Sequence, residues 1–343
     1  MNQALRIPTI DDVRDAQERI APYLSPTPLY RYDDLTELVG IEIWVKHENH
    51  QPVGAFKVRG GINLALQLTA EERKRGLIAA STGNHGQSIA YAARLLDINA
   101  TICVPEGANP TKVGAIRALG AEIIVHGRDF DEAREHCAQL AAERGHRYVH
   151  SGDEPHLIAG VATITLEILQ QQPEIDVVIV PVGGGSGAAG ACIVAKNAAR
   201  SVEVVAVQSA AAPAAYLSWT AKELREATTQ TFAEGLATRV GFELPQRILW
   251  QLLDTFVLVA DDEIRRAVLE MIKGTRNLAE PAGAAPLAAA IKLRNRLAGK
   301  RVALICSGGN ISLPQLGELI TGVTARTLNT SRSVKPNPSP SAG

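Results

Sequence analysis

The residue best suited to chemistry is Lys57, which stands directly after an aromatic side chain in the glycine-bounded run 54–61. A lysine packed among Phe56, Val53 and Val58 is partly desolvated, which lowers the pKa of its ammonium group. The neutral amine can then attack a carbonyl and form a Schiff base. The plain alternative is a solvated lysine at the start of an amphipathic helix over 58–68, because few lysines are catalytic.

A second candidate is a glycine-rich loop between an apolar run and a helical one, made of Gly183, Gly184, Gly185, Ser186 and Gly187. Glycines let backbone amides converge on a phosphate at a helix N-terminus, where the helix dipole favours an anion. Gly185, Gly187 and Gly190 also match the dinucleotide fingerprint, so an NAD-dependent oxidoreductase is a remote alternative. The next strand ends in Gln208 rather than in the acidic residue that holds a ribose, which weighs against it. A simple glycine turn is the remaining interpretation.

Two further loops carry polar groups directly after apolar runs. One contains Ser81, Thr82, Gly83, Asn84 and His85 and precedes a helix, so its hydroxyls and N–H groups suit a carboxylate. His85 there could be a general base, although a histidine in a first helical turn is as often structural. The other loop contains Ser307 and Gly308 and is a weak signal by itself.

The elements that must position these loops alternate between apolar and helical patterns. Strands are predicted at 41–46, 77–80, 101–104, 122–125, 148–149, 177–180, 202–207, 256–259 and 301–305, and helices at 11–21 (N-cap Thr9), 58–68, 87–96, 112–119, 130–143 and 188–199. Such alternation favours parallel sheets with helices on their faces. All the candidate loops follow strands, so two sheets would face each other across the site.

The same pattern predicts the domain division. A large domain would comprise 1–75 and 152–325, and a small domain would comprise 76–151. The segment 326–343 lacks periodicity and apolar mass, so a disordered tail is expected there.

Composition narrows the class of protein. The 343 residues include 46% hydrophobic ones, and a formal net charge of -1 gives no electrostatic case for nucleic acid. The four cysteines are scattered without CxxC spacing, which favours reduced core thiols over zinc. The sequence shows no basic leader and no apolar run of membrane-spanning length. We therefore expect a cytoplasmic protein without a membrane partner.

In combination the loops closely resemble the threonine dehydratase and serine racemase family of pyridoxal 5'-phosphate enzymes, fold type II. The resemblance covers about 26–320. It rests on Phe-Lys-x-Arg-Gly, Ser-x-Gly-Asn-His-Gly, the glycine-rich loop, Glu-Pro-Ala-Gly at 280–283 and Ser-Gly-Gly-Asn. It implies two open, mostly parallel three-layer αβα domains, similar to the tryptophan synthase β chain, with the cofactor in the cleft between them.

The resemblance also implies the roles of residues. Lys57 would hold pyridoxal phosphate as a Schiff base, Phe56 would lie along the ring, and Asn84 would bond the ring hydroxyl. The cofactor site would be completed by Gly183, Gly184, Gly185, Ser186 and Gly187 at the phosphate, Ser307 at the pyridine nitrogen, and Glu280 and Gly308. The substrate would lie against Ser81, Thr82, Gly83, His85, Ser151 and Gly152.

This constellation implies a lyase that dehydrates and deaminates a β-hydroxy amino acid to a 2-oxo acid and ammonia. Lys57, once freed by substrate, would remove the α-proton, and the neutral hydroxyl of Ser307 would favour elimination over transamination. An amino-acid racemase is the near alternative, and a non-catalytic amino-acid binder is disfavoured by Lys57. A homodimer or larger homo-oligomer is expected.

Several positions depart from the family pattern. Thr82 stands where racemases of the family have a catalytic serine, which puts racemisation in doubt. Gln208 and Ala214 replace the two acidic ligands of an optional metal site, so no metal is expected. Ser151 and Gly152 replace bulkier residues beside the substrate side chain, which would open space on the order of a ring and admit phenylserine, unless neighbours fill it or the loop merely turns more tightly.

Overall fold

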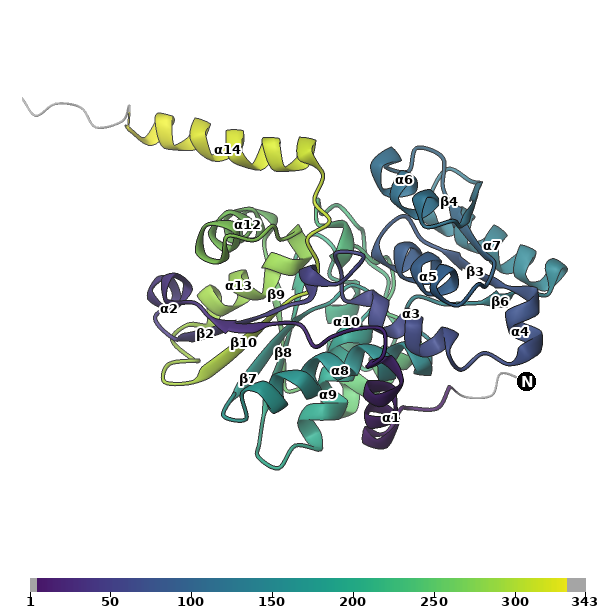
Figure 1. Cartoon of the computed structure of the whole chain (residues 1–343). Coiled ribbons are helices and arrows are strands. Elements are labelled where there is room, and N and C mark those ends of the chain that lie inside the picture. The colour runs from purple at the N-terminus through teal and green to yellow at the C-terminus, as the bar shows by residue number, and fades with distance from the viewer. Residues whose placement is uncertain (1–4, 332–343) are drawn as a thin grey trace, which may run out of the picture. The chain divides into compact units, whose positions relative to one another are not determined.

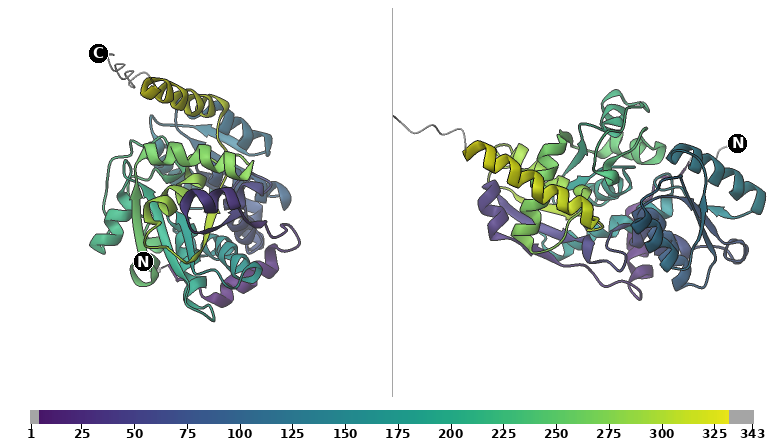
Figure 2. Two further views of the ribbon diagram at one scale, coloured as in Figure 1. Left: turned by 90° about the vertical axis from the view of Figure 1, so that its left-hand side faces the viewer. Right: turned by 90° about the horizontal axis from the view of Figure 1, so that it is seen from above.

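The structure, a computed structural model, describes residues 5–331 of the chain. The chain divides into two compact units, Met1–Asn310 and Ile311–Gly343, and both β-sheets belong to the first (Figures 1 and 2). The two sheets are therefore parts of one compact unit, and the division into a large and a small domain is a prediction about its substructure.

The larger sheet has the strand order β1-β2-β10-β7-β8-β9. Its strands are β1 (Leu29–Arg31), β2 (Glu42–His47), β7 (Val177–Pro181), β8 (Glu203–Ser209), β9 (Thr255–Val259) and β10 (Arg301–Cys306). All neighbours pair in parallel except β1, which runs antiparallel to β2. The sequence analysis missed β1 because three residues after a proline are too few to show an alternation.

The smaller sheet has the order β5-β4-β3-β6 and is parallel throughout. Its strands are β3 (Leu77–Ala80), β4 (Ala100–Val104), β5 (Glu122–Val125) and β6 (Arg147–Tyr148). The bounds of β3 and β5 are those predicted, and the other predicted strands differ by at most two residues at an end.

Helices cover both sheets, as parallel crossovers require. They are α1 (Ile10–Ile20), α2 (Asp33–Val39), α3 (Lys57–Ala65), α4 (Ala70–Arg75), α5 (Asn84–Leu95), α6 (Pro110–Ala118), α7 (Phe130–Arg144), α8 (Pro155–Gln171), α9 (Ser186–Lys196), α10 (Ala214–Ala221), α11 (Glu243–Leu252), α12 (Asp261–Thr275) and α13 (Pro281–Leu293), with the short 3-10 turns η1 (Glu48–His50) and η2 (Glu234–Leu236). In the larger sheet α9 packs on β7 and β8, while α13 packs on β10 and β7 from the other face (Figure 1). This is the expected three-layer αβα architecture.

The core beneath the site is built from the larger sheet and the helices α8 and α9. It contains Val178, Val180, Val204 and Ala206 from the strands, packed against apolar residues of both helices. Successive residues of these strands are buried on both faces, which is typical of a parallel sheet between helix layers.

The strand order decides which loops meet. β10 lies between β2 and β7, so the three loops at their carboxyl ends are neighbours, and these loops contain Lys57, Ser307 and the glycines 183–187. In the smaller sheet β3 pairs with β6, so the loop 81–86 lies beside the loop 150–154. Candidate residues that are up to 250 positions apart in sequence are thus gathered at strand ends.

The second unit contains α14 (Leu313–Ser331). Residues 326–331, which fall in the segment expected to be a disordered tail, form the end of this helix, and the tail itself stays a prediction. The rest of that predicted tail, 332–343, lies outside the described residues.

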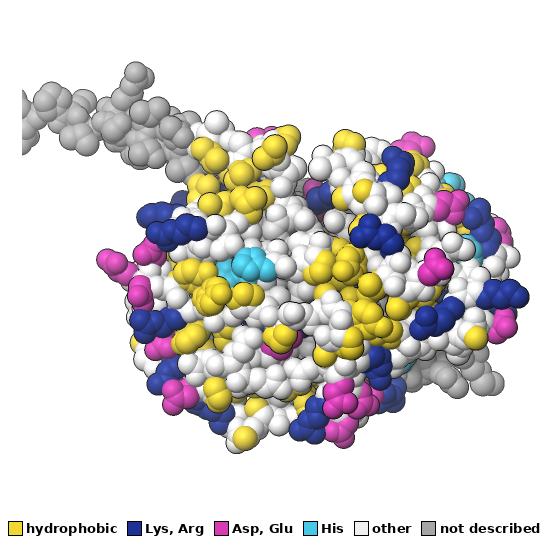
Figure 3. Space-filling view, viewed as in Figure 1, with side chains coloured by type: hydrophobic (Ala, Val, Ile, Leu, Met, Phe, Trp, Pro, Cys, Tyr) yellow, Lys and Arg dark blue, Asp and Glu magenta, His cyan; other side chains and the backbone are white. Residues whose placement is uncertain are grey.

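Basic and acidic side chains are interspersed around the face drawn in Figure 3, in keeping with a formal net charge of -1. Within the described range 5–331, no helix has both the length and the apolar character needed to cross a membrane.

Candidate active site

Lys57 is the first residue of α3, and a turn at 51–56, directly after η1, delivers it there. Its Nζ donates to the carbonyl oxygen of Ser151 at 2.9 Å and to Oγ of Ser186 at 2.8 Å, and it lies 5.3 Å from the ring centroid of Phe56. Both acceptors are neutral, so burial lowers the pKa of Lys57 to about 8. A substantial fraction of this amine is therefore neutral near physiological pH, as the sequence analysis predicted.

Glycines let α3 approach its two neighbouring helices closely. A Cβ atom at Gly61 would lie 2.3 Å from Oγ of Ser88 in α5, and one at Gly160 in α8 would lie 2.7 Å from the carbonyl oxygen of Arg59. Ser88 Oγ also donates to the Lys57 carbonyl oxygen at 2.7 Å. The backbone that carries the lysine is thus fixed from both sides.

A buried ionic network lies beneath α3. The guanidinium of Arg59 donates to both carboxylate oxygens of Glu48 at 2.7 and 2.8 Å and to both of Glu167 at 2.6 and 2.8 Å. Lys46 adds a 2.6 Å bond to Glu167, and Thr27 donates to Glu48 at 2.6 Å. Burial alone would lower the pKa of Arg59, but the two carboxylates raise it, so its charge is secure. The motif Phe-Lys-x-Arg-Gly pointed at Arg59, but nothing in the sequence linked it to Glu167.

The glycine-rich loop follows β7 and leads into α9. Gly185 has φ +89° and caps the helix, a conformation that favours glycine. Cβ atoms at Gly183 and Gly184 would lie 2.3 Å from the Gly235 carbonyl oxygen and from Phe242 Cε2, so neither position accepts a side chain. Since the first N–H groups of a helix have no intrahelical acceptor, this is a cradle for an anion.

The loop after β10 pairs with the backbone just before Lys57. Phe56 N–H donates to the Ser307 carbonyl oxygen at 2.9 Å, and Gly309 N–H donates to that of Gly54 at 2.9 Å. Ser307 is 4% exposed, and its hydroxyl has no hydrogen bond to another residue in the described part of the chain. A nearly buried hydroxyl without a protein partner is free to bond a ligand atom.

Asn84 connects the smaller sheet to the loops of the larger one. Its Nδ2 donates to Oε1 of Glu280 at 2.7 Å, and its Oδ1 accepts from Nδ2 of Asn310 at 2.8 Å. Burial raises the pKa of Glu280. A Cβ atom at Gly308 would lie 2.6 Å from the same Glu280 oxygen, so this glycine is also needed for space.

The loop 81–86 turns around one side chain. Ser81 Oγ accepts from the N–H groups of Gly83 at 3.2 Å and Gly86 at 2.9 Å. Nothing lies within 4 Å of the place where a Cβ of Gly83 would be, and α5 begins at Asn84. The N-terminus of α5 therefore opens toward free space that a carboxylate could occupy.

His85 is buried, and its Nε2 lies 3.2 Å from the carbonyl oxygen of Val149, which fixes Nε2 as the protonated nitrogen. Burial, helped by Lys57, lowers the pKa of His85 to about 3, so the ring is neutral. Its Nδ1 is buried without a partner among the described residues. The ring holds the loop 81–86 against the end of β6.

The loop after β6 brings Ser151 to the lysine amine but leaves no open space beside Gly152. A Cβ atom at Gly152 would lie 2.3 Å from Cδ2 of Phe242, a residue that the sequence analysis did not single out. The open space expected there is absent because a ring from a distant segment fills it, which is the exception that the expectation allowed for. A lone phenylalanine in a loop carries no periodic signal, so only the fold could reveal it.

Gln208 uses both ends of its side-chain amide in protein contacts. Its Oε1 accepts from the Tyr216 N–H at 3.1 Å, and its Nε2 donates to the Leu236 carbonyl oxygen at 3.5 Å. Ala214 begins α10. Within residues 5–331 no group of three or more His, Cys, Asp or Glu side chains is arranged to hold a metal ion.

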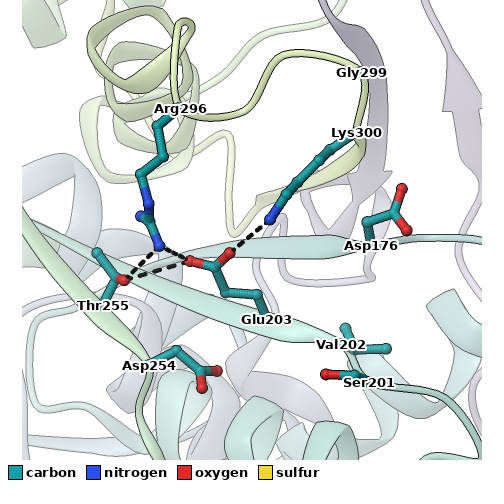
Figure 4. Close-up of a pocket in the computed structure, with 9 residues that line it drawn as sticks. All are labelled: Asp176, Ser201, Val202, Glu203, Asp254, Thr255, Arg296, Gly299 and Lys300. Carbon is teal, nitrogen blue, oxygen red and sulfur yellow. Dashed lines mark hydrogen bonds and ion pairs between the residues drawn. The ribbon is translucent and has the colours of Figure 1, made fainter.

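A cavity of about 440 Å³ lies elsewhere, at the amino ends of the larger sheet's strands (Figure 4). Glu203 there is bound by Arg296 and, at 3.1 Å, by Lys300, while Asp254 is bound by Lys196 at 2.6 Å. Each of these two carboxylates therefore has at least one cationic partner. The cavity is therefore at the opposite end of the strands from Lys57 and is no part of the candidate site.

The residues gathered around Lys57 fit pyridoxal phosphate. The glycine cradle suits its phosphate, the desolvated amine suits its aldehyde, and the unpartnered hydroxyl of Ser307 suits a ring atom. Phe56 supplies an aromatic face within 3.4 Å of a Cβ built at Gly187. Every candidate cofactor residue thus lies in one cluster of loops.

Comparison with known proteins agrees with this geometry. Residues 20–308 match the family described as pyridoxal-phosphate dependent enzyme. The chain is 37% identical to an L-threonine ammonia-lyase of Thermotoga maritima over 91% of this chain and 78% of that protein. The solved structure of threonine deaminase isoform 2 from Solanum lycopersicum is similar with a TM-score of 0.85 and 31% identity, covering 92% of this chain and 94% of that one.

Serine racemase from Dictyostelium discoideum is similar to the same degree, with a TM-score of 0.84 and 32% identity over 89% of this chain and 99% of that one. The resemblance inferred from five short motifs is therefore confirmed over most of the sequence. The chain belongs to the pyridoxal-phosphate dependent enzymes of fold type II.

Proposed function

We propose that this protein is a pyridoxal-phosphate dependent ammonia-lyase that dehydrates and deaminates threonine or serine to the corresponding 2-oxo acid and ammonia. The observation that carries the proposal is the Lys57 amine, which is partly buried with two neutral acceptors and has a pKa lowered to about 8. The relatives named as threonine ammonia-lyases and threonine deaminases support the same reaction class.

Each residue of the site has a part in holding the cofactor. Lys57 would bind it covalently, with Phe56 along its ring. The phosphate would be held by backbone N–H groups of Gly183, Gly184, Gly185 and Gly187, by the Ser186 hydroxyl and by the α9 dipole. Asn84 keeps a second Nδ2 hydrogen for the ring hydroxyl, because only one is used on Glu280.

When bound, pyridoxal phosphate supplies an electron sink that acidifies the Cα–H bond of the substrate. Ser307 tunes this chemistry, because its neutral hydroxyl does not stabilise a protonated pyridine nitrogen as a carboxylate would. Elimination of a β-hydroxyl is then favoured over transamination. Glu280 and Gly308 complete the wall on the same side of the site.

The substrate carboxylate would lie at the N-terminus of α5. The N–H groups of the first turn of α5 that are not bonded to Ser81, together with the hydroxyl of Thr82, would bond the carboxylate there, and Gly83 leaves room for it. His85 is neutral there and orients the loop rather than carrying charge.

Lys57 acts on protons at its Nζ. Released by the substrate amine, the neutral Nζ takes the α-proton, because its lowered pKa leaves it unprotonated often enough to act as a base. Its neighbours Ser151 and Ser186 keep Nζ between the loop 150–154 and the glycine loop, which restricts the face from which the proton is taken. The β-hydroxyl would then leave as water with the proton that Nζ has taken, and hydrolysis of the resulting enamine would give the 2-oxo acid and ammonia.

A second candidate activity is racemisation of the same amino acids. The similarity to serine racemase favours it. Racemisation needs a second acid on the opposite face, and Thr82, with a stiffer β-branched side chain than serine, is the residue available there. We therefore expect 2-oxo acid formation to outpace the appearance of the opposite enantiomer, which chiral chromatography measures in the same reaction mixture.

The deciding experiment measures ammonia and 2-oxo acid from a panel of β-hydroxy amino acids. Threonine or serine should give both products in equal amounts. The same amino acids without the β-hydroxyl, 2-aminobutyrate and alanine, are the matched controls and should give none. Release of neither product from any β-hydroxy substrate by enzyme that carries its cofactor would contradict the proposed reaction.

The last part of the proposal concerns the oligomeric state and the cellular compartment of the enzyme. We infer a homodimer or larger homo-oligomer in the cytoplasm. All four cysteines are buried free thiols, which suits a reducing compartment. Sedimentation measures the assembly, and a monomer at micromolar concentration would contradict it.

A further inference from the structure

Phe242 occupies a place that the chain has cleared for it. A Cβ atom at Gly152 would lie 2.3 Å from its Cδ2, and one at Gly184 would lie 2.3 Å from its Cε2. The imidazole of His150 meets the same ring edge to face, with centroids 4.8 Å apart. Two glycines and an aromatic partner thus surround this ring on the side of the site.

The ring is held there by an unusual helix start. Phe242 is the N-cap of α11, a position where Ser, Thr, Asp or Asn is preferred, and it makes no capping hydrogen bond. The cap comes instead from the loop after β6, where Asp153 Oδ1 accepts from the N–H of Leu244 at 2.8 Å. The capping bond therefore ties the start of α11 to the loop 150–154, and the N-cap position is freed for an aromatic side chain.

The two glycines that face Phe242 lie next to both groups that hold the lysine amine. Ser151, whose carbonyl oxygen accepts from Lys57 Nζ, directly precedes Gly152. Ser186, the other acceptor, lies two residues after Gly184. A substrate whose Cα is within reach of Lys57 has its β-substituent close to these two loops, and thus close to the ring that packs between them.

We propose that Phe242 is a specificity-determining residue that limits the size of the substrate's β-substituent, so that the methyl of threonine fits and an aryl group does not. This inference rests on the proposed function for the identity of the substrate, but the size limit itself applies to any amino acid bound at Lys57. The ring belongs to the N-cap residue of α11. Gly152 makes room for that ring and does not leave an empty space in the substrate site.

The first test measures binding without turnover. Alanine and phenylalanine carry no leaving group on Cβ, so the cofactor's absorbance change reports their dissociation constants directly. In the wild type phenylalanine should bind at least about tenfold more weakly than alanine, and Phe242→Ala should improve its binding at least about tenfold while leaving alanine within about threefold. Phe242→Leu should give an intermediate ratio and serves if the alanine variant is unstable.

The second test moves the ring. Gly152→Phe alone should lower stability and activity, since its Cβ would overlap Phe242. The double variant Phe242→Ala/Gly152→Phe should regain the wild-type preference for alanine. Phe130→Ala, at an exposed phenylalanine in α7, is the matched control and should change neither constant.

An unchanged ratio of the two dissociation constants in Phe242→Ala, or wild-type enzyme that binds phenylalanine as well as alanine, would overturn the inference. Turnover of threonine and phenylserine is assayed in parallel. Absence of 2-oxo acid from every variant, together with the expected binding ratios, would refute the dehydratase activity and leave the size limit standing.

Discussion

On one side of α3 the guanidinium of Arg59 lies between two carboxylates, and on the other side the amine of Lys57 has a carbonyl and a hydroxyl as acceptors. The two residues are two positions apart in a helix, so they point to nearly opposite faces. Arg59 is fully buried, and Lys57 is partly buried. The charge of the neighbouring groups decides the direction of each pKa shift. The two carboxylates raise the pKa of Arg59, whereas Lys57 has only neutral acceptors and burial lowers its pKa to about 8. The same helix therefore has a permanent charge beneath it and a reactive amine above it.

Substitution of Lys57, the reactive one of these two residues, should have the largest effect on activity. Lys57→Ala should lower kcat/KM for threonine by at least about 10²–10⁴-fold, because it removes both the covalent attachment point and the base. It should also abolish the visible absorbance that the lysine–cofactor bond gives the purified protein. Absorbance spectra and ammonia release measure the two effects, and a yellow, active variant would refute the assignment of Lys57.

Removing the paired side should damage stability instead. Arg59→Met leaves Glu48 as a buried carboxylate without an ion partner and Glu167 with Lys46 alone. Losing one partner of such a network costs about 3–5 kcal/mol. Urea unfolding measures this loss. Arg14→Met, which breaks the exposed pair with Asp11, is the control and should change the free energy of unfolding by about 1 kcal/mol or less. If the two substitutions lowered the free energy of unfolding equally, loss of the cation from the buried network would cost no more than loss of the exposed ion pair, which would contradict this prediction.

The pKa of Lys57 sharpens the comparison further. Only the neutral amine attacks an aldehyde, so the rate at which cofactor-free enzyme takes up pyridoxal phosphate should rise about tenfold per pH unit at low pH and level off above about pH 8. A lysine at the ordinary value of 10.5 would show a rate still rising at pH 9. Stopped-flow absorbance from pH 6 to 10 measures the profile, and continued steep rise above pH 9 contradicts a lowered pKa.

The smallest expected effect concerns metal. The side-chain amide of Gln208 is hydrogen-bonded to the backbone of Tyr216 and Leu236. Neither Gln208 nor Ala214 supplies a negative charge for a divalent cation. Activity should therefore be unchanged, within assay error, after treatment with a chelator. The double variant Gln208→Glu/Ala214→Asp is the counterpart and should become sensitive to chelation. Loss of wild-type activity that magnesium restores would overturn this prediction.

Most of the architecture could be predicted from short-range pattern. The bounds of β3 and β5 match the predicted apolar runs, and Thr9 caps α1 as expected, accepting from the Asp12 N–H. Loops that follow such strands are bound to lie at one edge of a parallel sheet, which is why Lys57, the glycine loop and Ser307 could be placed together. These features depend on residues close in sequence.

What could not be predicted depends on residues far apart. Glu167 reaches Arg59 across 108 positions, and Phe242 fills the space beside Gly152 from 90 positions away. The sequence shows the glycine but not the ring that lies beside it, so it left open whether the space there is filled. Because protein interiors are closely packed, the space beside a glycine should be assumed to be filled by a neighbouring side chain.

The close approach of α3 to α5 and α8 has a genetic consequence. Every missense change in a glycine codon adds at least one carbon atom, and at Gly61 or Gly160 that atom would meet its neighbours at 2.3 and 2.7 Å. The helix would have to move, and Lys57 would move with it. Loss-of-function alleles should therefore accumulate at these two codons, although neither residue touches substrate, and no conservative replacement exists among the other nineteen amino acids.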